Sequence, residues 1–133
     1  MRVFIDTNIL ISCIVWPESK PAKAFFKAAY MNEAILCEYS IEEIYRVFSR
    51  KFPGYVSEMR NFLAKNMTVL KVVSVPDEPY EEEQLIRDEN DRPILRAAIN
   101  TGADILLTGD KDFLEAGITN PRILSASGFL ELA

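Results

Sequence analysis

Apolar positions along the chain alternate between short strand-like runs and longer segments with helical spacing. Runs rich in β-branched and aromatic residues predict strands over residues 2–6, 34–37, 69–75, 104–108 and 122–125. Apolar residues recurring every three or four positions predict helices over residues 9–16, 21–30, 40–52 and 56–65, from 91 to 102, and at the C-terminal end. Strands that alternate with helices indicate a mostly parallel sheet with helices on both faces. We therefore predict an α/β fold in which residues 1–133 form a single domain, the usual arrangement at this length.

Helix boundaries can be predicted from individual residues. Ser40, with Glu43 three positions later, has the spacing of a capping box and predicts a helix that starts at Ser40. Asp91 stands before Arg-Pro and has the character of an N-cap. Gly102 is expected to end that helix. Residues 76–90 hold two prolines and few large apolar residues, which favours a solvated connection, open to motion, with some helix around residues 81–86.

Composition points to a globular protein of the cytoplasm. Apolar residues make up 49% of the chain and charged residues 26%, and no run approaches the roughly 18 apolar residues of a membrane-spanning helix. Asp6 lies where the apolar region of a signal peptide would run, so we expect neither export nor a membrane partner. Cys13 and Cys37 stand in apolar surroundings and are expected to be core thiols, in keeping with a reducing compartment.

The chain contains no histidine, which excludes His-containing triads and nearly every His-containing zinc site, so any catalysis must run mostly on carboxylates. The net charge of −5 argues against a nucleic-acid partner at first sight. However, residues 77–91 contain eight acids and one base, so the rest of the chain has 14 basic and 12 acidic residues. The overall sign is therefore a poor guide to the local field.

Two acids follow directly on predicted strands. Asp6 and Asp110 are expected at the carboxyl ends of parallel strands, where open α/β sheets bind ligands. Glu43 and Asp91, near the starts of two helices, can reach the same rim if those helices begin beside it. Carboxylates about 4 Å apart repel by roughly 4 kcal/mol at an effective dielectric near 20, so they must protonate, pair with bases or bind a cation. Oxygen ligands select Mg²⁺ or Mn²⁺, and phosphodiester hydrolysis by activated water needs no further nucleophile.

Each acid also has a purely structural interpretation. Asp6 suits a turn after a strand, Glu43 a capping box, and Asp91 an N-cap. Asp110 and Asp112 flank Lys111, so they can cap a helix or pair with that lysine. One metal site explains all of them more economically than separate structural roles.

Three motifs together resemble the PIN-domain nucleases, above all the single-domain VapC-type toxins of prokaryotic toxin–antitoxin pairs. They are VFIDTNILIS, EEIYRVFSRKF and DENDRPILRAAINTGADILLTGDKDF, in the family's order and spacing. The resemblance covers nearly the whole chain and implies a three-layer α/β/α fold and a metal-dependent ribonuclease. It maps metal-binding positions onto Asp6, Glu43, Asp91 and Asp110, with Asp112 as an outer or auxiliary ligand. Thr7, Asn8 and Thr108 match accessory positions, and Asp88 is an alternative to Asp91.

The resemblance also implies partners. An antitoxin segment is expected to cover the acidic site, with an arginine inserted among the acids, and the toxin is expected to be a homodimer.

Basic side chains at helical spacing are candidates for contacts with RNA phosphates. Arg46 and Arg50, beside Lys51, share a predicted helix with Glu43, and Lys20, Lys23 and Lys27 form a second group. For each group the alternative is an ordinary solvated helix face. Phe25, Phe26 and Tyr30 are expected to be core or partner contacts, because aromatic residues at helical spacing usually pack.

Two other functions remain open at this point. A catalytically silent PIN-like module would bind RNA or a protein without hydrolysis. A phosphatase or phosphoacceptor domain would use Asp6 as a nucleophile, although Asp-Thr-Asn lacks a second acid two positions on.

Overall fold

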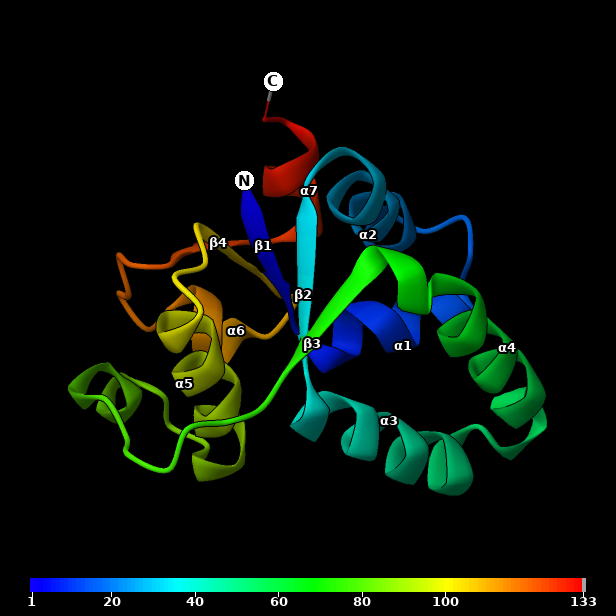
Figure 1. The fold of residues 1–133 in the computed structure, drawn as a ribbon, viewed down its shortest axis with the longest axis horizontal. Helices are drawn as coiled ribbons and strands as arrows, with labels where there is room; N and C mark the ends of the chain where they lie inside the picture. Colours follow the sequence, from blue (N-terminus) through cyan, green and yellow to red (C-terminus); the bar gives the residue numbers. More distant parts are fainter. Residues whose placement is uncertain (133) are drawn as a thin grey trace.

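The computed structural model describes residues 1–132 and has a five-stranded parallel sheet at its centre. The strands follow the order β3-β2-β1-β4-β5, and every neighbouring pair is parallel (Figure 1). The strands are β1 (Arg2–Ile5), β2 (Glu33–Cys37), β3 (Leu70–Val73), β4 (Ile105–Leu107) and β5 (Arg122–Leu124). The parallel α/β fold predicted from the sequence is confirmed.

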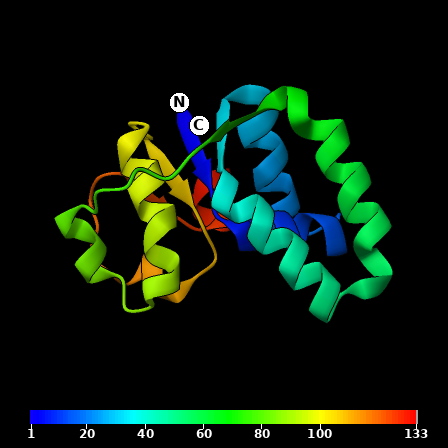
Figure 2. The ribbon, with the colours of Figure 1, turned by 60° about the horizontal axis from the view of Figure 1, so that its bottom comes forward.

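Helices connect successive strands and cover both faces of the sheet (Figures 1 and 2). The α-helices are α1 (Thr7–Val15), α2 (Lys20–Met31), α3 (Glu38–Lys51), α4 (Val56–Asn66), α5 (Arg92–Asn100), α6 (Lys111–Leu114) and α7 (Ala126–Leu130). Short 3₁₀ helices are η1 (Pro53–Tyr55), η2 (Met67–Val69), η3 (Glu81–Leu85) and η4 (Glu89–Asp91). No helix in the described part of the chain combines the length and apolar character needed to cross a bilayer.

Alternation along the central strands divides the core into two halves. The side chains of Val3 and Ile5 lie on one face of the sheet, in the core formed with α1, α2, α3, α4 and α7. The side chain of Phe4, between them, lies on the opposite face, in the core formed with α5 and α6. All three side chains are fully buried. The strands are apolar on both sides because a parallel sheet is covered on both sides, and this burial produces the expected three layers.

The helix that carries Glu43 begins earlier than predicted. It starts at Glu38, with Cys37 as its N-cap residue, so Ser40 lies inside the first turn. The Ser40 hydroxyl is buried and has no hydrogen-bond partner in the described residues. The capping-box assignment of Ser40 and Glu43 is therefore wrong, because the helix follows directly on β2 and leaves no room for a separate cap.

The acidic connection before α5 is held in place more firmly than its composition suggested. Glu83, only 3% exposed, accepts three hydrogen bonds from the Arg96 guanidinium at 2.8–3.2 Å. Ile86 is fully buried, and its carbonyl oxygen accepts from Arg92 Nε at 3.1 Å. The helix predicted around residues 81–86 is confirmed as η3, and most side chains of the connection are exposed as predicted, but Glu83 and Ile86 are buried and supply ion-pair and core contacts to α5.

Other side-chain predictions had mixed outcomes. Cys13 and Cys37 are buried, as expected, and burial raises the pKa of the Cys13 thiol to about 12. Lys27 donates from Nζ to the carbonyl oxygens of Phe129 and Leu132, both at 2.8 Å, so it stabilises the C-terminal end of α7 rather than presenting a solvated face or a phosphate site. Phe25 is buried in the core, whereas Phe26 and Tyr30 stack at the surface with ring centroids 6.1 Å apart.

Candidate metal centre

The acids meet where the order of strands reverses. The chain builds β1, β2 and β3 in one direction across the sheet and then places β4 and β5 on the other side of β1. At such a reversal the connections leaving neighbouring strands diverge to opposite faces, which opens a ligand site at the carboxyl edge. Asp6 follows β1 and Asp110 follows β4 by three residues, so both acids lie at this edge. Figure 2 brings the edge forward, between α3 and α5.

Asp6 is the buried centre of a hydrogen-bonded group. The residue is 5% exposed; Oδ1 accepts from the backbone N–H of Thr7 at 2.7 Å, and Oδ2 accepts from the Thr108 hydroxyl at 2.7 Å. The Thr108 Oγ1 in turn accepts from the backbone N–H of Asp110 at 3.0 Å. Thr108 therefore fixes the two acid-bearing strand ends relative to each other.

Glu43 and Asp91 approach from the two flanking helices. Glu43 is half-buried in the second turn of α3, next to the buried Ile44. Asp91 is the N-cap residue of α5 by position, but its carboxylate makes no capping hydrogen bond in the described chain. The N-cap interpretation of its side chain is wrong, and the carboxylate is left free to face the other acids.

Tyr39 holds these two sides together. Its hydroxyl donates to the carbonyl oxygen of Asn90 at 2.8 Å, which joins the start of α3 to the turn that carries Asp91. The sequence gives no signal for this contact beyond the presence of a tyrosine, because it depends on the tertiary placement of η4.

The four acids line one hollow of about 130 Å³. They reach it from four separate segments of the chain, which confirms that the predicted acids converge. The other lining residues are Thr7, Asn8, Ile11 and Val47. Ile11 and Val47 were not predicted as site residues, since their apolar helical spacing is that of ordinary core positions.

The hollow is strongly unfavourable for negative charge. Burial raises the pKa of Asp6 to about 6, with Glu43 and Asp110 adding to the shift and the hydrogen bonds from Thr108 and Thr7 opposing it. Burial likewise raises the pKa of Asp91 to about 7, and the charges of Asp110, Asp6 and Asp88 add to that shift. Within residues 1–132 no lysine or arginine forms an ion pair with any of the four acids.

The donor set fits a hard divalent cation. All side-chain donors are oxygens, as Mg²⁺ and Mn²⁺ prefer. Asp91, Asp110 and Asp112 each offer a carboxylate oxygen within 4.8 Å of the other two. Thr7 gives an independent indication, because its hydroxyl is buried beside the hollow with no hydrogen-bond partner in the described chain. An unsatisfied buried hydroxyl at this place suits a hydrated cation, whose waters can hydrogen-bond to it.

Asp112 lies at the margin and has a basic partner. Its Oδ1 accepts from the Arg87 guanidinium at 2.6 Å, which is an ion pair with Arg87 and not with the adjacent Lys111. Its backbone N–H donates to Asp110 Oδ1 at 2.9 Å, so Asp110 also caps α6. The N-cap interpretation of Asp110 is thus confirmed alongside its place in the hollow. Arg87 was missed as a site residue, although it is the single base in the acidic stretch.

The alternative acid and the predicted arginines lie outside the hollow. Asp88 is exposed and accepts from the backbone N–H of Asn90 at 3.0 Å, which caps η4. Arg46 and Arg50 are exposed on α3, three residues beyond Glu43 and Val47 respectively, where they line a shallow depression with Tyr45 and Ser49. Both arginines therefore stand next to the acidic hollow on the surface of the same helix.

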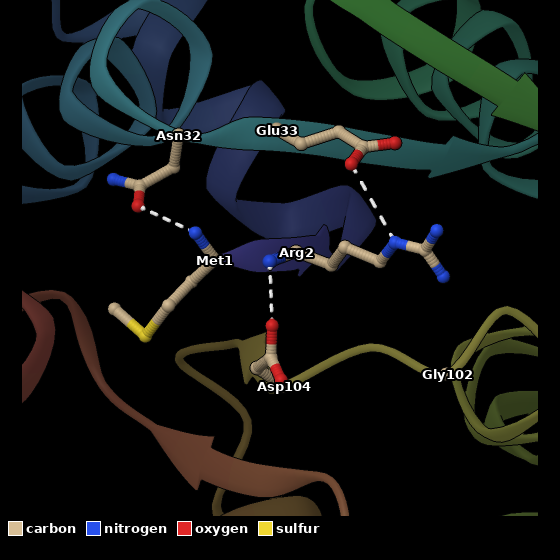
Figure 3. A pocket seen from close by; sticks show the side chains of 6 residues that line it. All are labelled: Met1, Arg2, Asn32, Glu33, Gly102 and Asp104. Carbon is tan, nitrogen blue, oxygen red and sulfur yellow. Dashed lines mark hydrogen bonds and ion pairs between the residues drawn. The ribbon is translucent and has the colours of Figure 1, made fainter.

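A larger depression, of about 580 Å³, lies at the opposite, amino edge of the sheet (Figure 3). Here the polar groups satisfy one another: the backbone N–H of Arg2 donates to Asp104 at 2.7 Å, and Arg2 Nε lies 3.5 Å from Glu33. The Met1 amino group donates to Asn32 Oδ1 at 3.3 Å. Size alone therefore does not identify the functional site. The acids of the larger depression, Glu33 and Asp104, have basic or backbone N–H partners. The four acids of the smaller hollow have no basic partner in residues 1–132.

Known proteins resemble the chain in sequence and in fold. An uncharacterized protein of Methanocaldococcus jannaschii is 31% identical over 120 residues, covering 86% of this chain and 74% of that protein. The crystal structure of VapBC2 from Rickettsia felis, bound to a DNA fragment from their promoter, contains a chain with the same fold at a TM-score of 0.68. That match covers 94% of this chain and 98% of the other at 19% identity. A model of the PIN domain matches residues 2–112, which include all four acids of the hollow. The chain belongs to the PIN domain family.

Proposed function

We propose that the protein is a divalent-metal-dependent endoribonuclease in which Asp6, Glu43, Asp91 and Asp110 hold Mg²⁺ or Mn²⁺. The observation that carries the proposal is the convergence of these carboxylates, without basic partners in the described chain, on one hollow at the carboxyl edge of the sheet. Repulsion between these carboxylates lowers the stability of the fold, whereas a site that binds a divalent cation requires such a cluster of negative charge.

The residues of the hollow have separable tasks. A divalent ion held there supplies Lewis acidity, which lowers the pKa of an attacking water and offsets charge that develops on the phosphate. Asp6 is oriented by Thr7 and Thr108, so its two oxygens are fixed before any ion binds. Thr7, through its free hydroxyl, and Asn8, on the exposed lip of the hollow, are placed to orient water or substrate.

Arg46 and Arg50 provide the nearest exposed positive charge on α3. Both extend from the helix that carries Glu43, and neither forms an ion pair in residues 1–132. Arginine binds phosphate oxygens with two parallel N–H donors. We assign both to the RNA backbone, where they offset repulsion between the phosphates and the acids.

The toxin role rests on family membership together with the fold of the VapBC2 chain. We propose that the protein acts in the cytoplasm as the toxin of a toxin–antitoxin pair, as a homodimer, and that an antitoxin segment covers the acidic hollow. Size-exclusion chromatography with light scattering measures the mass of the toxin alone and of the purified pair.

The test of the hydrolytic activity is metal add-back on purified protein. Protein stripped with EDTA is incubated with a labelled single-stranded RNA, and Mg²⁺, Mn²⁺ or neither is then restored. We expect cleavage only with a divalent ion and products without 2′,3′-cyclic phosphate ends, because water attacks instead of the 2′-hydroxyl.

Asp110→Asn protein, purified in parallel, controls for contaminating ribonucleases. Cleavage that persists in EDTA, or that the variant retains in full, contradicts the proposal. If the wild-type protein binds RNA but leaves it intact even with a divalent ion present, it is instead the catalytically silent PIN-like module.

A further inference from the structure

Arg87 is the one basic side chain paired with the acids around the hollow in the described chain. Its terminal nitrogen lies 2.6 Å from Asp112 Oδ1, and Asp112 has an oxygen within 4.8 Å of oxygens of both Asp91 and Asp110. The arginine side chain is nevertheless 86% exposed. Arg87 thus stands at the margin of the site with most of its surface in water.

The backbone that carries Arg87 is fixed on both sides. Ile86, which precedes it, is fully buried, donates its N–H to the carbonyl oxygen of Glu83 at 3.0 Å and accepts from Arg92 Nε. Asp88, which follows it, caps η4 through the N–H of Asn90. The guanidinium therefore extends from an anchored point and not from a free loop.

Most of the guanidinium remains available for a ligand. Only one of its nitrogens bonds to Asp112, while an arginine has five N–H donors in a planar fork. An exposed arginine with one carboxylate contact gains little stability from that contact, since surface ion pairs contribute about 0–1 kcal/mol. The pair therefore sets the direction of the guanidinium more than it stabilises the fold.

We infer that Arg87 binds a phosphate oxygen of the RNA next to the scissile bond, and that Asp112 positions Arg87 and is not a metal ligand. The inference rests on the proposed function, because it takes RNA as the substrate. It places a positive group on the α5–α6 side of the hollow, opposite Arg46 and Arg50 on α3. An RNA strand that crosses the hollow then contacts arginines on both sides of it.

The two possible roles of Asp112 predict different effects of removing its carboxylate. If Asp112 positions Arg87, its removal matters only while Arg87 is present, and the affinity for metal stays unchanged. If Asp112 binds metal, its removal weakens metal affinity whether or not Arg87 is present. A double-mutant cycle separates these two outcomes.

The experiment measures equilibrium binding of a fluorescent single-stranded RNA to the full chain in Ca²⁺, over a series of salt concentrations. The proteins are wild type, Arg87→Ala, Arg87→Lys, Asp112→Asn and the double variant, with Arg60→Ala as the matched control. Arg60 is an exposed arginine on α4, away from the hollow, with no ion pair in residues 1–132. Mn²⁺ affinity of each protein is measured separately by electron paramagnetic resonance.

We expect Arg87→Ala to weaken RNA binding about ten-fold, as for loss of a charged hydrogen bond, and to lower the salt slope by about 0.7, as for one lost contact with a single strand. Arg87→Lys retains the salt slope but loses part of the affinity, because lysine keeps the charge and lacks the fork. Asp112→Asn weakens RNA binding less, adds nothing to Arg87→Ala, and leaves Mn²⁺ affinity unchanged. Arg60→Ala binds RNA as the wild type does.

Three results would overturn the inference. If Arg87→Ala binds RNA with the wild-type affinity and salt slope, Arg87 does not contact a phosphate. An Asp112→Asn substitution that lowers Mn²⁺ affinity makes Asp112 a metal ligand, and one that weakens RNA binding equally in the Arg87→Ala background shows that Asp112 does not act through Arg87. Wild-type protein that binds no RNA defeats the proposed function itself, and with it the role of Arg87.

Discussion

The two edges of the sheet use similar polar side chains in opposite ways. At the amino edge, Arg2 and Lys71 both lie within 4.0 Å of Glu33, and Asp104 accepts from the backbone of Arg2. At the carboxyl edge, Asp6 and Asp91 face further acids, and the pKa of each is raised by burial and by its neighbours. At the amino edge the charged groups pair with one another, whereas at the carboxyl edge the carboxylates repel one another.

The difference shows what marks a functional site in this molecule. Groups at the amino edge are exposed and paired, so they contribute modest stability and need no ligand. Groups at the carboxyl edge lower the stability of the metal-free fold, and such a cost persists only where a ligand offsets it. We therefore regard the larger hollow as structural and propose that the smaller one carries the chemistry.

Matched aspartate substitutions at the two edges give the largest expected contrast. Asp6→Asn should reduce metal-dependent RNA cleavage by more than about 100-fold, since even the outer partners of metal ligands are worth about 10–100-fold. Asp104→Asn, the same chemical change at the amino edge, should leave cleavage rates at the wild-type level. Gel assays of both variants, with circular dichroism to verify folding, measure the contrast; equal losses would remove the distinction between the edges.

The stability of metal-free protein should fall as pH rises. The pKa of Asp6 is raised to about 6 and that of Asp91 to about 7, both from 3.8, so the folded chain binds more protons than the unfolded chain between those values. The free energy of unfolding then decreases from about pH 4 to about pH 7, where it levels off. The raised pKa of Asp6 alone corresponds to a loss on the order of 3 kcal/mol. Asp91 adds to this loss, with its share discounted for its partial exposure to solvent.

Urea unfolding at several pH values measures this loss, and Mn²⁺ should restore stability most at the high end of the range. Asp91→Asn should flatten the pH dependence and raise metal-free stability at high pH. A pH profile that is unchanged in this variant would show that Asp91 does not carry the repulsion.

The smallest expected effect lies at the amino edge. Glu33→Gln removes the charge shared by Arg2 and Lys71 and should lower the free energy of unfolding by less than about 1 kcal/mol, because these side chains are half-exposed. High salt should abolish the difference between variant and wild type. A loss of several kcal/mol in thermal or urea unfolding would mean that the amino edge stabilises the fold far more than surface pairs usually do.

The sequence predicts those parts of the site that depend on local pattern. Asp6 and Asp110 were placed correctly because each follows a short apolar strand, and the ends of parallel strands share an edge. The sequence does not by itself place Glu43 and Asp91 at the same hollow, because their positions depend on how α3 and α5 pack across the sheet. Their convergence was predicted only by assuming that all four acids form one site.

Other features could not be predicted for physical reasons. Ser40 satisfies every local rule for an N-cap, yet the helix begins two residues earlier because β2 runs directly into it. The Arg87–Asp112 pair joins residues 25 positions apart through a tertiary contact, and no helical or strand periodicity encodes such a distance. The burial of Glu83 likewise depends on Arg96, a residue of the next helix.

The order of the strands also determines when the hollow exists during synthesis. The segment from β1 through β3 contains Asp6 and Glu43 but neither Asp91 nor Asp110, because Asp91 precedes β4 and Asp110 follows it, both later in the chain than β3. An unfinished chain therefore holds only half of the carboxylates. Under the proposed function, a chain synthesised only as far as β3 cannot assemble the metal site, so RNA cleavage has to wait for the later segments that carry Asp91 and Asp110.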